Sequence, residues 1–166
     1  MEIVLTPPEV GFMEKHQIEN RIHWDTNKIQ YNAKNILDKT IPLVPEDAYC
    51  MLSVTMEDIY PRPEWNFVFG LANLTSRTGV FSFVRYDPMF WGIKDPIRDL
   101  TLLKNACGVM VHEIGHMFGI KHCIYFNCTM NGFNSYSEST RDSRYLCPVC
   151  LRKLSKAIGF KVKDWL

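Results

Sequence analysis

The sequence of 166 residues predicts an α/β fold of the α+β kind, in which a small twisted mixed sheet is backed by helices and followed by a smaller C-terminal lobe. Two observations lead to this prediction. Strand-like and amphipathic helical segments fill residues 1–119, whereas after Gly119 the periodicity fades and turn residues and cysteines accumulate. We therefore expect one domain over residues 1–166, with an N-terminal lobe over residues 1–119 and a C-terminal lobe over residues 120–166.

The first expected elements are a helix and a strand. Apolar residues recur at helical spacing over residues 26–38, which predicts an amphipathic helix capped near Asp25 or Thr26. Residues 49–55 are rich in β-forming types and predict a strand.

A β-hairpin is expected next. Residues 65–74 and 79–86 have the composition of strands, and the turn-like residues 75–78 join them. The second strand is either an exposed edge, which would align an extended peptide through main-chain hydrogen bonds, or an interior strand.

A long helix should begin at Asp95 and Pro96, which suit the cap and the first helical position, and should end near Phe118. Its expected core-facing stripe is apolar at steps of three and four and consists of Leu103, Cys107, Met110, Ile114 and Met117. A shorter helix is expected over residues 147–158.

The charge balance excludes several classes of protein. Hydrophobic residues make up 46% of the chain and charged residues 22%, proportions that exclude disorder and a collagen-like structure. The net charge of +1 provides no field for nucleic acid or anionic membranes, and no apolar run approaches the ~20 residues that span a bilayer. We therefore expect no binding to nucleic acid or membrane. We also expect a monomer.

The long helix carries a candidate metal site. His112 and His116 are four residues apart, so about 40° of rotation and 6 Å of rise separate them and both imidazoles can reach one ion. Glu113 can stand beside that ion as a general base. Counted from the expected core stripe, both histidines should lie on the free face of the helix.

A third ligand follows the helix. His122 comes three residues after Gly119, and Gly at this position allows the positive φ of the sharp turn that would return the chain to the other two histidines. A catalytic zinc site needs three protein ligands and one open position.

The motif His112-Glu113-x-x-His116-x-x-Gly119-x-x-His122 resembles the signature of the metzincin clan of zinc peptidases. The residues that follow make the chain similar, more specifically, to the archaemetzincin family. They are Cys123 directly after the third histidine, then Cys128, Met130, Cys147 and Cys150.

The resemblance implies a metzincin-like zincin fold with a cleft between the lobes, two zinc ions per chain and a role for each motif residue. The catalytic zinc would be bound by His112, His116 and His122, with Glu113 as the general base. Met130 would form the hydrophobic floor under the site. A structural zinc would be bound by Cys123, Cys128, Cys147 and Cys150.

The cysteine spacing supports the second metal independently. Two pairs, C-x4-C and C-x-x-C, lie in a segment with little regular structure, where thiolate coordination would supply folding energy. Two disulfides or idle thiols are the alternatives. No secretion signal is evident, which favours an intracellular (cytoplasmic or nuclear) reducing compartment. Cys50 and Cys107 are expected to be core residues.

Adjacency links the two sites. Because His122 and Cys123 are neighbours, the two metals should lie within about 13 Å of one another. We expect the cysteine cluster to fix the turn that places His122.

The function expected from these residues is zinc-dependent hydrolysis of peptide bonds, in which Glu113 activates a zinc-bound water against a peptide or protein substrate. Aminopeptidase-like and restricted endopeptidase action both fit. The alternative is a zinc-stabilised protein- or nucleic-acid-binding module without turnover. Tyr136 and Tyr145 are weaker candidates for stabilising an oxyanion, and His16 and His23 are expected at the surface.

Overall fold

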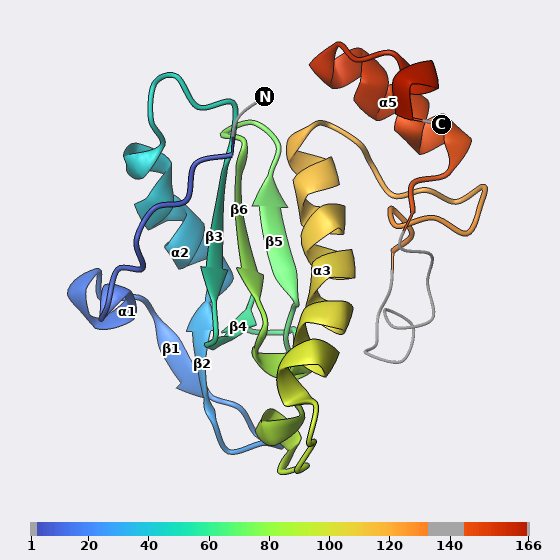
Figure 1. Cartoon of the computed structure of the whole chain (residues 1–166). Helices are drawn as coiled ribbons and strands as arrows, with labels where there is room; N and C mark the ends of the chain where they lie inside the picture. The colour runs from blue at the N-terminus through green and yellow to red at the C-terminus, as the bar shows by residue number, and fades with distance from the viewer. Residues whose placement is uncertain (1–2, 133–144, 166) are drawn as a thin grey trace.

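The computed structural model describes residues 3–132 and 145–165, and within them the α+β class is confirmed (Figure 1). In chain order the elements are α1 (Phe12–Lys15), β1 (Asn20–Ile22), β2 (Ile29–Asn32), α2 (Ala33–Thr40), the 3₁₀ turn η1 (Ile41–Leu43), β3 (Met51–Thr55), β4 (Asp58–Tyr60), β5 (Gly70–Asn73), β6 (Thr78–Ser82), the 3₁₀ turns η2 (Val84–Tyr86) and η3 (Pro88–Trp91), α3 (Arg98–Met117), α5 (Pro148–Ile158) and the 3₁₀ turn η4 (Val162–Trp165).

The strands form two small mixed sheets instead of the single sheet expected. One has the order β1-β2-β4 and the other β3-β6-β5, and each contains one parallel and one antiparallel pair. The predicted hairpin is confirmed as the antiparallel pair β5–β6. Strands β1 and β4 escaped the sequence analysis because each has only three residues, too few to show an alternating pattern.

Strand β6 is the centre of its sheet, so the expectation of an exposed edge at residues 79–86 is wrong and the interior alternative is right. All five residues of β6 are buried. Val80 packs with Ile36 and Leu37 of α2, whereas its neighbour Phe81 packs with Ala106 of α3. Because successive strand residues point to opposite faces, α2 and α3 cover opposite faces of this sheet.

The helix predicted over residues 26–38 forms only in its second half. Residues Ile29–Asn32 are strand β2, and α2 begins after Asn32, whose side chain accepts hydrogen bonds from the backbone N–H groups of Lys34 and Asn35. The cap is therefore Asn32 and not Asp25 or Thr26. Pairing of β2 with both β1 and β4 outweighs the helical spacing of its apolar residues.

Helix α3 runs close to its predicted bounds, but its buried face is not the expected stripe. Leu103 is 53% exposed and Cys107 is also exposed, whereas Ala106 and Val109 are buried against the sheet and Met117 is buried as expected. The buried face of α3 differs from the predicted one because this helix has apolar residues on several sides. Their spacing alone does not determine which side packs against the sheet.

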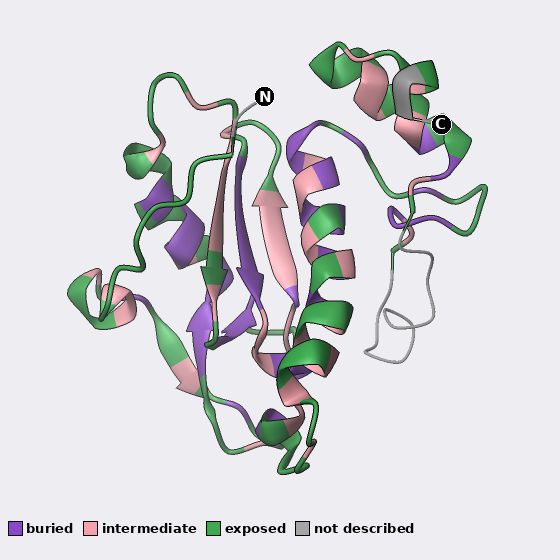
Figure 2. Ribbon diagram, in the orientation of Figure 1, coloured by how far each residue is buried: buried purple, intermediate pink, exposed green. Residues whose placement is uncertain are grey.

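Burial elsewhere corrects two further expectations (Figure 2). Cys107 is not a core residue, and Cys50 is only half-buried. None of the described helices is both long and apolar enough to cross a bilayer.

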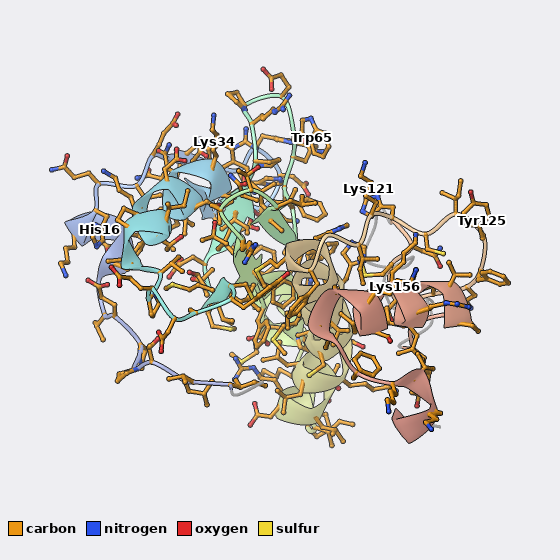
Figure 3. The ribbon with its side chains drawn as sticks, turned by 90° about the horizontal axis from the view of Figure 1, so that it is seen from above. His16, Lys34, Trp65, Lys121, Tyr125 and Lys156 are labelled. Carbon is orange, nitrogen blue, oxygen red and sulfur yellow. The ribbon has the colours of Figure 1, made fainter. Side chains whose placement is uncertain are left out.

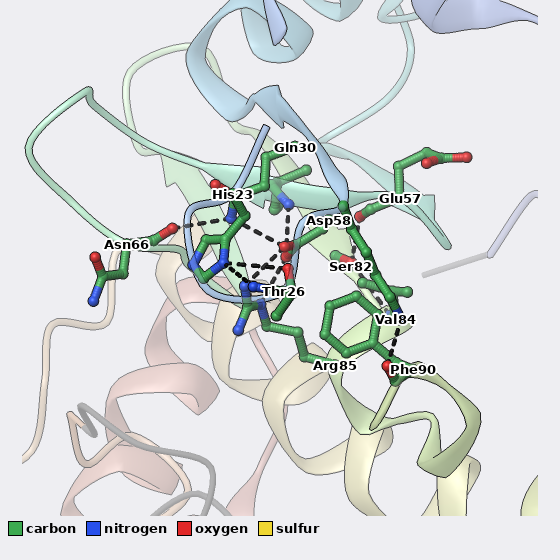
Figure 4. A network of polar contacts seen from close by, with 12 residues as sticks. His23, Thr26, Gln30, Glu57, Asp58, Asn66, Ser82, Val84, Arg85 and Phe90 are labelled. Atoms are coloured by element: carbon green, nitrogen blue, oxygen red, sulfur yellow. Dashed lines mark hydrogen bonds and ion pairs between the residues drawn. The ribbon is translucent and has the colours of Figure 1, made fainter. Parts of the chain in front are cut away.

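A buried charge pair links β4 to the 3₁₀ turn that follows β6 (Figure 4). Arg85 of η2 donates from Nε and Nη2 to the two carboxylate oxygens of Asp58 in β4, at 2.7 and 2.8 Å. Gln30 of β2 donates to the same carboxylate at 3.0 Å, and the guanidinium lies 3.8 Å from the Phe67 ring centroid. Paired donors and acceptors of this kind allow two charges to be buried.

His23 lies beside this network and is buried, not at the surface as expected. Its Nδ1 accepts hydrogen bonds from the backbone N–H groups of Asp25 and Thr26. Burial lowers the pKa of the His23 imidazole.

Replacing Arg85 by alanine should lower the free energy of unfolding by about 3 kcal/mol or more, because Asp58 would remain buried without its partner. Equilibrium urea unfolding measures the change. Arg62→Ala, at an exposed position, is the matched control. A loss no greater than that of the control would show that the pair does not stabilise the fold.

Candidate metal centre

Helix α3 ends in the turn that the sequence analysis expected at Gly119. Gly119 has a φ of 78°, its N–H donates to the His116 carbonyl, and the N–H of Ile120 donates to the Gly115 carbonyl. This pair of hydrogen bonds is a Schellman motif, which closes a helix and reverses the chain. The reversal brings His122 back beside the helix.

The three histidines converge on one point. Each offers a ring nitrogen, and the three nitrogens lie within 4.8 Å of one another. His112 and His116 come from consecutive turns of α3, and His122, which is exposed, comes from the segment after the turn. The structure thus brings together the three residues that the spacing selected.

Backbone carbonyls orient two of the rings. His112 Nδ1 lies 2.8 Å from the Thr129 carbonyl oxygen, and His116 Nδ1 lies 2.7 Å from the Ile120 carbonyl oxygen. Since a carbonyl can only accept, both Nδ1 atoms carry the hydrogen, and both Nε2 atoms present lone pairs. Such second partners fix the tautomer and the orientation of a metal-binding imidazole.

The donor set fits a zinc ion. The Nε2 atoms of His112 and His116 are 3.0 Å apart, where two lone pairs repel one another unless a cation lies between them. Two nitrogen ligands about 2.05 Å from one tetrahedral ion would be about 3.3 Å apart. These histidines could therefore hold zinc with little movement.

Burial determines the electrostatics around the three nitrogens. It lowers the pKa of His112 to about 4, against the opposing effect of the Thr129 carbonyl, and it also lowers the pKa of His116. Both rings are therefore neutral near pH 7, the state in which imidazole binds metal. The expectation that the histidines lie on a free helix face is wrong for His112, which is buried under the C-terminal segment, defined as residues 120–132 and 145–165.

Glu113 directly follows His112 and packs against strand β5. It is buried, and burial raises the pKa of its carboxyl group to about 8. A Cβ added at Gly70 would come within 2.7 Å of the Glu113 Cγ and Cδ atoms. The sequence analysis missed Gly70. A glycine within a segment of strand composition was its only signal.

Met130 lies directly beneath the helix. It is fully buried, and a Cβ added at Gly115 would overlap its sulfur atom. Met130 therefore packs against the backbone of α3 between His112 and His116. Gly115, to which the sequence analysis gave no role, makes this contact possible because it has no side chain.

The four cysteines of the C-terminal segment form a second cluster. All four are buried and none forms a disulfide, and their sulfur atoms lie within 4.8 Å of one another. The sulfur atoms of Cys123 and Cys147 are 3.8 Å apart, close to the separation of about 3.8 Å between two thiolates on one tetrahedral zinc ion. These sulfur atoms could hold a zinc ion.

Backbone N–H groups surround these sulfur atoms. Cys128 Sγ accepts from the N–H of Cys147 at 3.2 Å, and Cys147 Sγ accepts from the N–H of Cys150 at 3.4 Å. The N–H groups of Tyr125, above all, and of Phe126 lower the pKa of the Cys123 thiol to about 7. Donors of this kind stabilise the thiolate form that binds metal.

The structure describes only one of the two tyrosine candidates. Tyr145 is 81% exposed, and Tyr136 lies outside the described residues. His16 is half-buried near the other end of the fold (Figure 3).

Three imidazoles on a helix and its following turn, with a buried carboxyl group beside them, define a site of the zinc-peptidase class. The chain belongs to peptidase family M54, whose model matches residues 9–156. The resemblance to archaemetzincins is thereby confirmed.

Individual relatives agree. Archaemetzincin-2 of Macaca fascicularis is 39% identical over 167 residues, which cover 87% of this chain and 46% of that protein. The archaemetzincin structure from Methanopyrus kandleri has a TM-score of 0.64 at 34% identity and covers 78% of this chain and 67% of that one. A zinc-dependent peptidase from Methanocorpusculum labreanum has a TM-score of 0.67 at 29% identity over 78% and 75%. The chain spans about half the length of the curated relative.

Replacing both Cys147 and Cys150 by serine should weaken zinc retention at both clusters, because Cys123 of the cysteine cluster directly follows His122. Zinc content per chain after dialysis against a weak chelator measures the effect. Cys50→Ser combined with Cys107→Ser is the matched control, since neither residue belongs to the cluster. Loss of one zinc with the histidine-bound zinc retained at the wild-type level would refute the link.

Proposed function

We propose that this chain is the catalytic domain of a zinc-dependent peptidase and that it hydrolyses peptide bonds in peptide or protein substrates. The observation that supports this best is the convergence of three imidazole nitrogens on one point, with the buried carboxyl group of Glu113 on the residue that follows the first of them. A binding module without turnover would need neither this carboxyl group nor a third histidine. The lobes over residues 1–119 and 120–166 are the two parts of this single domain.

His112, His116 and His122 would hold the catalytic zinc. Bound there, zinc would polarise the scissile carbonyl and lower the pKa of water. A cation held by the histidines would favour the ionised form of Glu113 and so oppose the effect of burial on its pKa. Glu113, as the general base, would then take a proton from the attacking water at its carboxylate and pass it to the leaving amine. Met130 and Gly119 support the site, Met130 from below the helix and Gly119 by turning the chain toward His122.

The four clustered cysteines would hold a second, structural zinc, for a total of two per chain. The sulfur spacing and the surrounding N–H donors support this role. Thiolate coordination would stabilise a segment in which α5 buries only Cys150 among its described residues.

We place the substrate along β5, the sheet edge on the side of Glu113. An extended peptide can add to an edge strand through main-chain hydrogen bonds. This arrangement fits an aminopeptidase or a restricted endopeptidase, and a peptide library with free and blocked amino termini distinguishes the two.

Replacing Glu113 by alanine should leave zinc content unchanged and lower kcat by about a hundredfold or more, because the general base is lost. Cleavage of the peptide library together with metal analysis measures both quantities. Glu46→Ala, at an exposed position, is the control. A zinc-loaded Glu113→Ala protein that cleaves at the wild-type rate would eliminate the proposed mechanism.

Replacing Gly70 by alanine should lower kcat by about tenfold or more, because the new methyl group pushes the Glu113 carboxyl group out of position. Zinc content and the melting temperature should change little, since the displaced atoms are the end of a flexible side chain. Gly108→Ala is the matched control because its added Cβ meets no atom within 4 Å. Unchanged kcat in Gly70→Ala would contradict the proposed contact.

A further inference from the structure

Asn131, which follows Met130, makes three hydrogen bonds with its side chain. Its Nδ2 donates to the Cys123 carbonyl at 2.6 Å and to the Phe126 carbonyl at 3.0 Å. Its Oδ1 accepts from the N–H of Cys128 at 2.7 Å. One amide group thus bonds to the beginning, the middle and the end of the loop between the first two cysteines.

Between its two cysteines, this loop exposes its large apolar side chains. Ile124, Tyr125 and Phe126 are 82%, 74% and 53% exposed, so burial of apolar surface contributes little to its shape. Tyr125 lies on the far side of the C-terminal segment from the sheet (Figure 3). Hydrogen bonds therefore set the course of the backbone from Cys123 to Cys128.

The course of that backbone matters because it begins one residue after His122. The N–H of Cys123 donates to the Met130 carbonyl at 2.7 Å, and the Cys123 carbonyl accepts from Asn131. Both peptide groups of Cys123 are thus held by two consecutive residues, Met130 and Asn131. These two hydrogen bonds set the direction in which the His122 side chain projects from the backbone.

His122 depends on that attachment more than the other two histidines do. Within the described residues, His112 and His116 bond a backbone carbonyl through Nδ1, whereas no such hydrogen bond is seen for His122. The His122 ring instead lies close to Gly132, where an added Cβ would be 3.0 Å from Nδ1. Its position follows from the backbone on either side.

We propose that Asn131 is the positioning residue for His122. The inference rests on the proposed metal-binding role of His122. The Asn131 amide holds the carbonyl group of Cys123, the residue that follows His122. This contact acts in place of the direct hydrogen bond to a backbone carbonyl that orients His112 and His116.

The test is a competition between chelator and protein for zinc, with the full chain loaded at both sites. Cobalt exchanged into the two sites separates them, because cobalt bound by thiolates absorbs strongly by charge transfer and cobalt bound by imidazoles does not. Asn131→Asp keeps the acceptor Oδ1 and removes both donors. We expect the histidine site to lose about tenfold or more in zinc affinity, the usual effect of losing an orienting partner, while the cysteine cluster keeps its metal.

Two further variants complete the test. Asn131→Ala removes the side-chain contacts without adding charge and should give the same selective loss. Asn73→Asp is the matched control, because Asn73 uses only its Oδ1, as acceptor from Thr75 and Ser76, and an aspartate keeps these bonds.

The outcomes are distinct. Selective loss at the histidine site in both Asn131 variants supports the proposal. Affinity of that site within about twofold of the wild type, or equal loss from both sites, overturns it. A wild-type chain that binds metal only at the cysteine cluster would instead refute the proposed function, and the wild-type titration shows this before any variant is compared.

Discussion

The hydrogen bond from His112 Nδ1 to the Thr129 carbonyl is the contact on which the arrangement of the site depends. It crosses from helix α3 to the C-terminal segment, at a residue that lies between Cys128 and Met130. A buried, neutral imidazole needs this partner, since burial alone would leave its N–H unsatisfied. The stretch from Cys128 to Met130 thus orients the His112 ring and also contains a clustered cysteine and the methionine beneath the helix. A shift of its backbone would displace all three.

The spacing of the histidines and of the cysteines predicted that each set would converge, and both sets do. Metal ligands must meet at one ion, and a helix followed by a glycine turn offers few ways to do so, which is why His112, His116 and His122 converge as expected. Gly119 has the positive φ that its position required. Ligand geometry is thus a local property of the sequence, readable over a dozen residues.

Properties that depend on partners distant in the sequence could not be predicted. The stripe through Leu103 and Cys107 has helical spacing but faces solvent, because the packing of α3 on β5 and β6 decides which side is buried. His23 is buried beside Asp58 and Arg85, two residues that are distant from it in the sequence. Gly70 and Asn131 act through contacts whose partners lie on other elements or across a loop, and no local pattern in the sequence marks such contacts.

The adjacency of His122 and Cys123 has a thermodynamic consequence. Two ions whose ligands are neighbouring residues share the cost of ordering the backbone between them, so the first ion to bind reduces the cost that the second must meet. With zinc at both sites, as proposed, linkage would make this effect reciprocal: the free energy by which a cysteine-bound ion would tighten the histidine site would equal that by which a histidine-bound ion would tighten the cluster. A chain of this design would fill and empty its two sites cooperatively, although no atom is common to both.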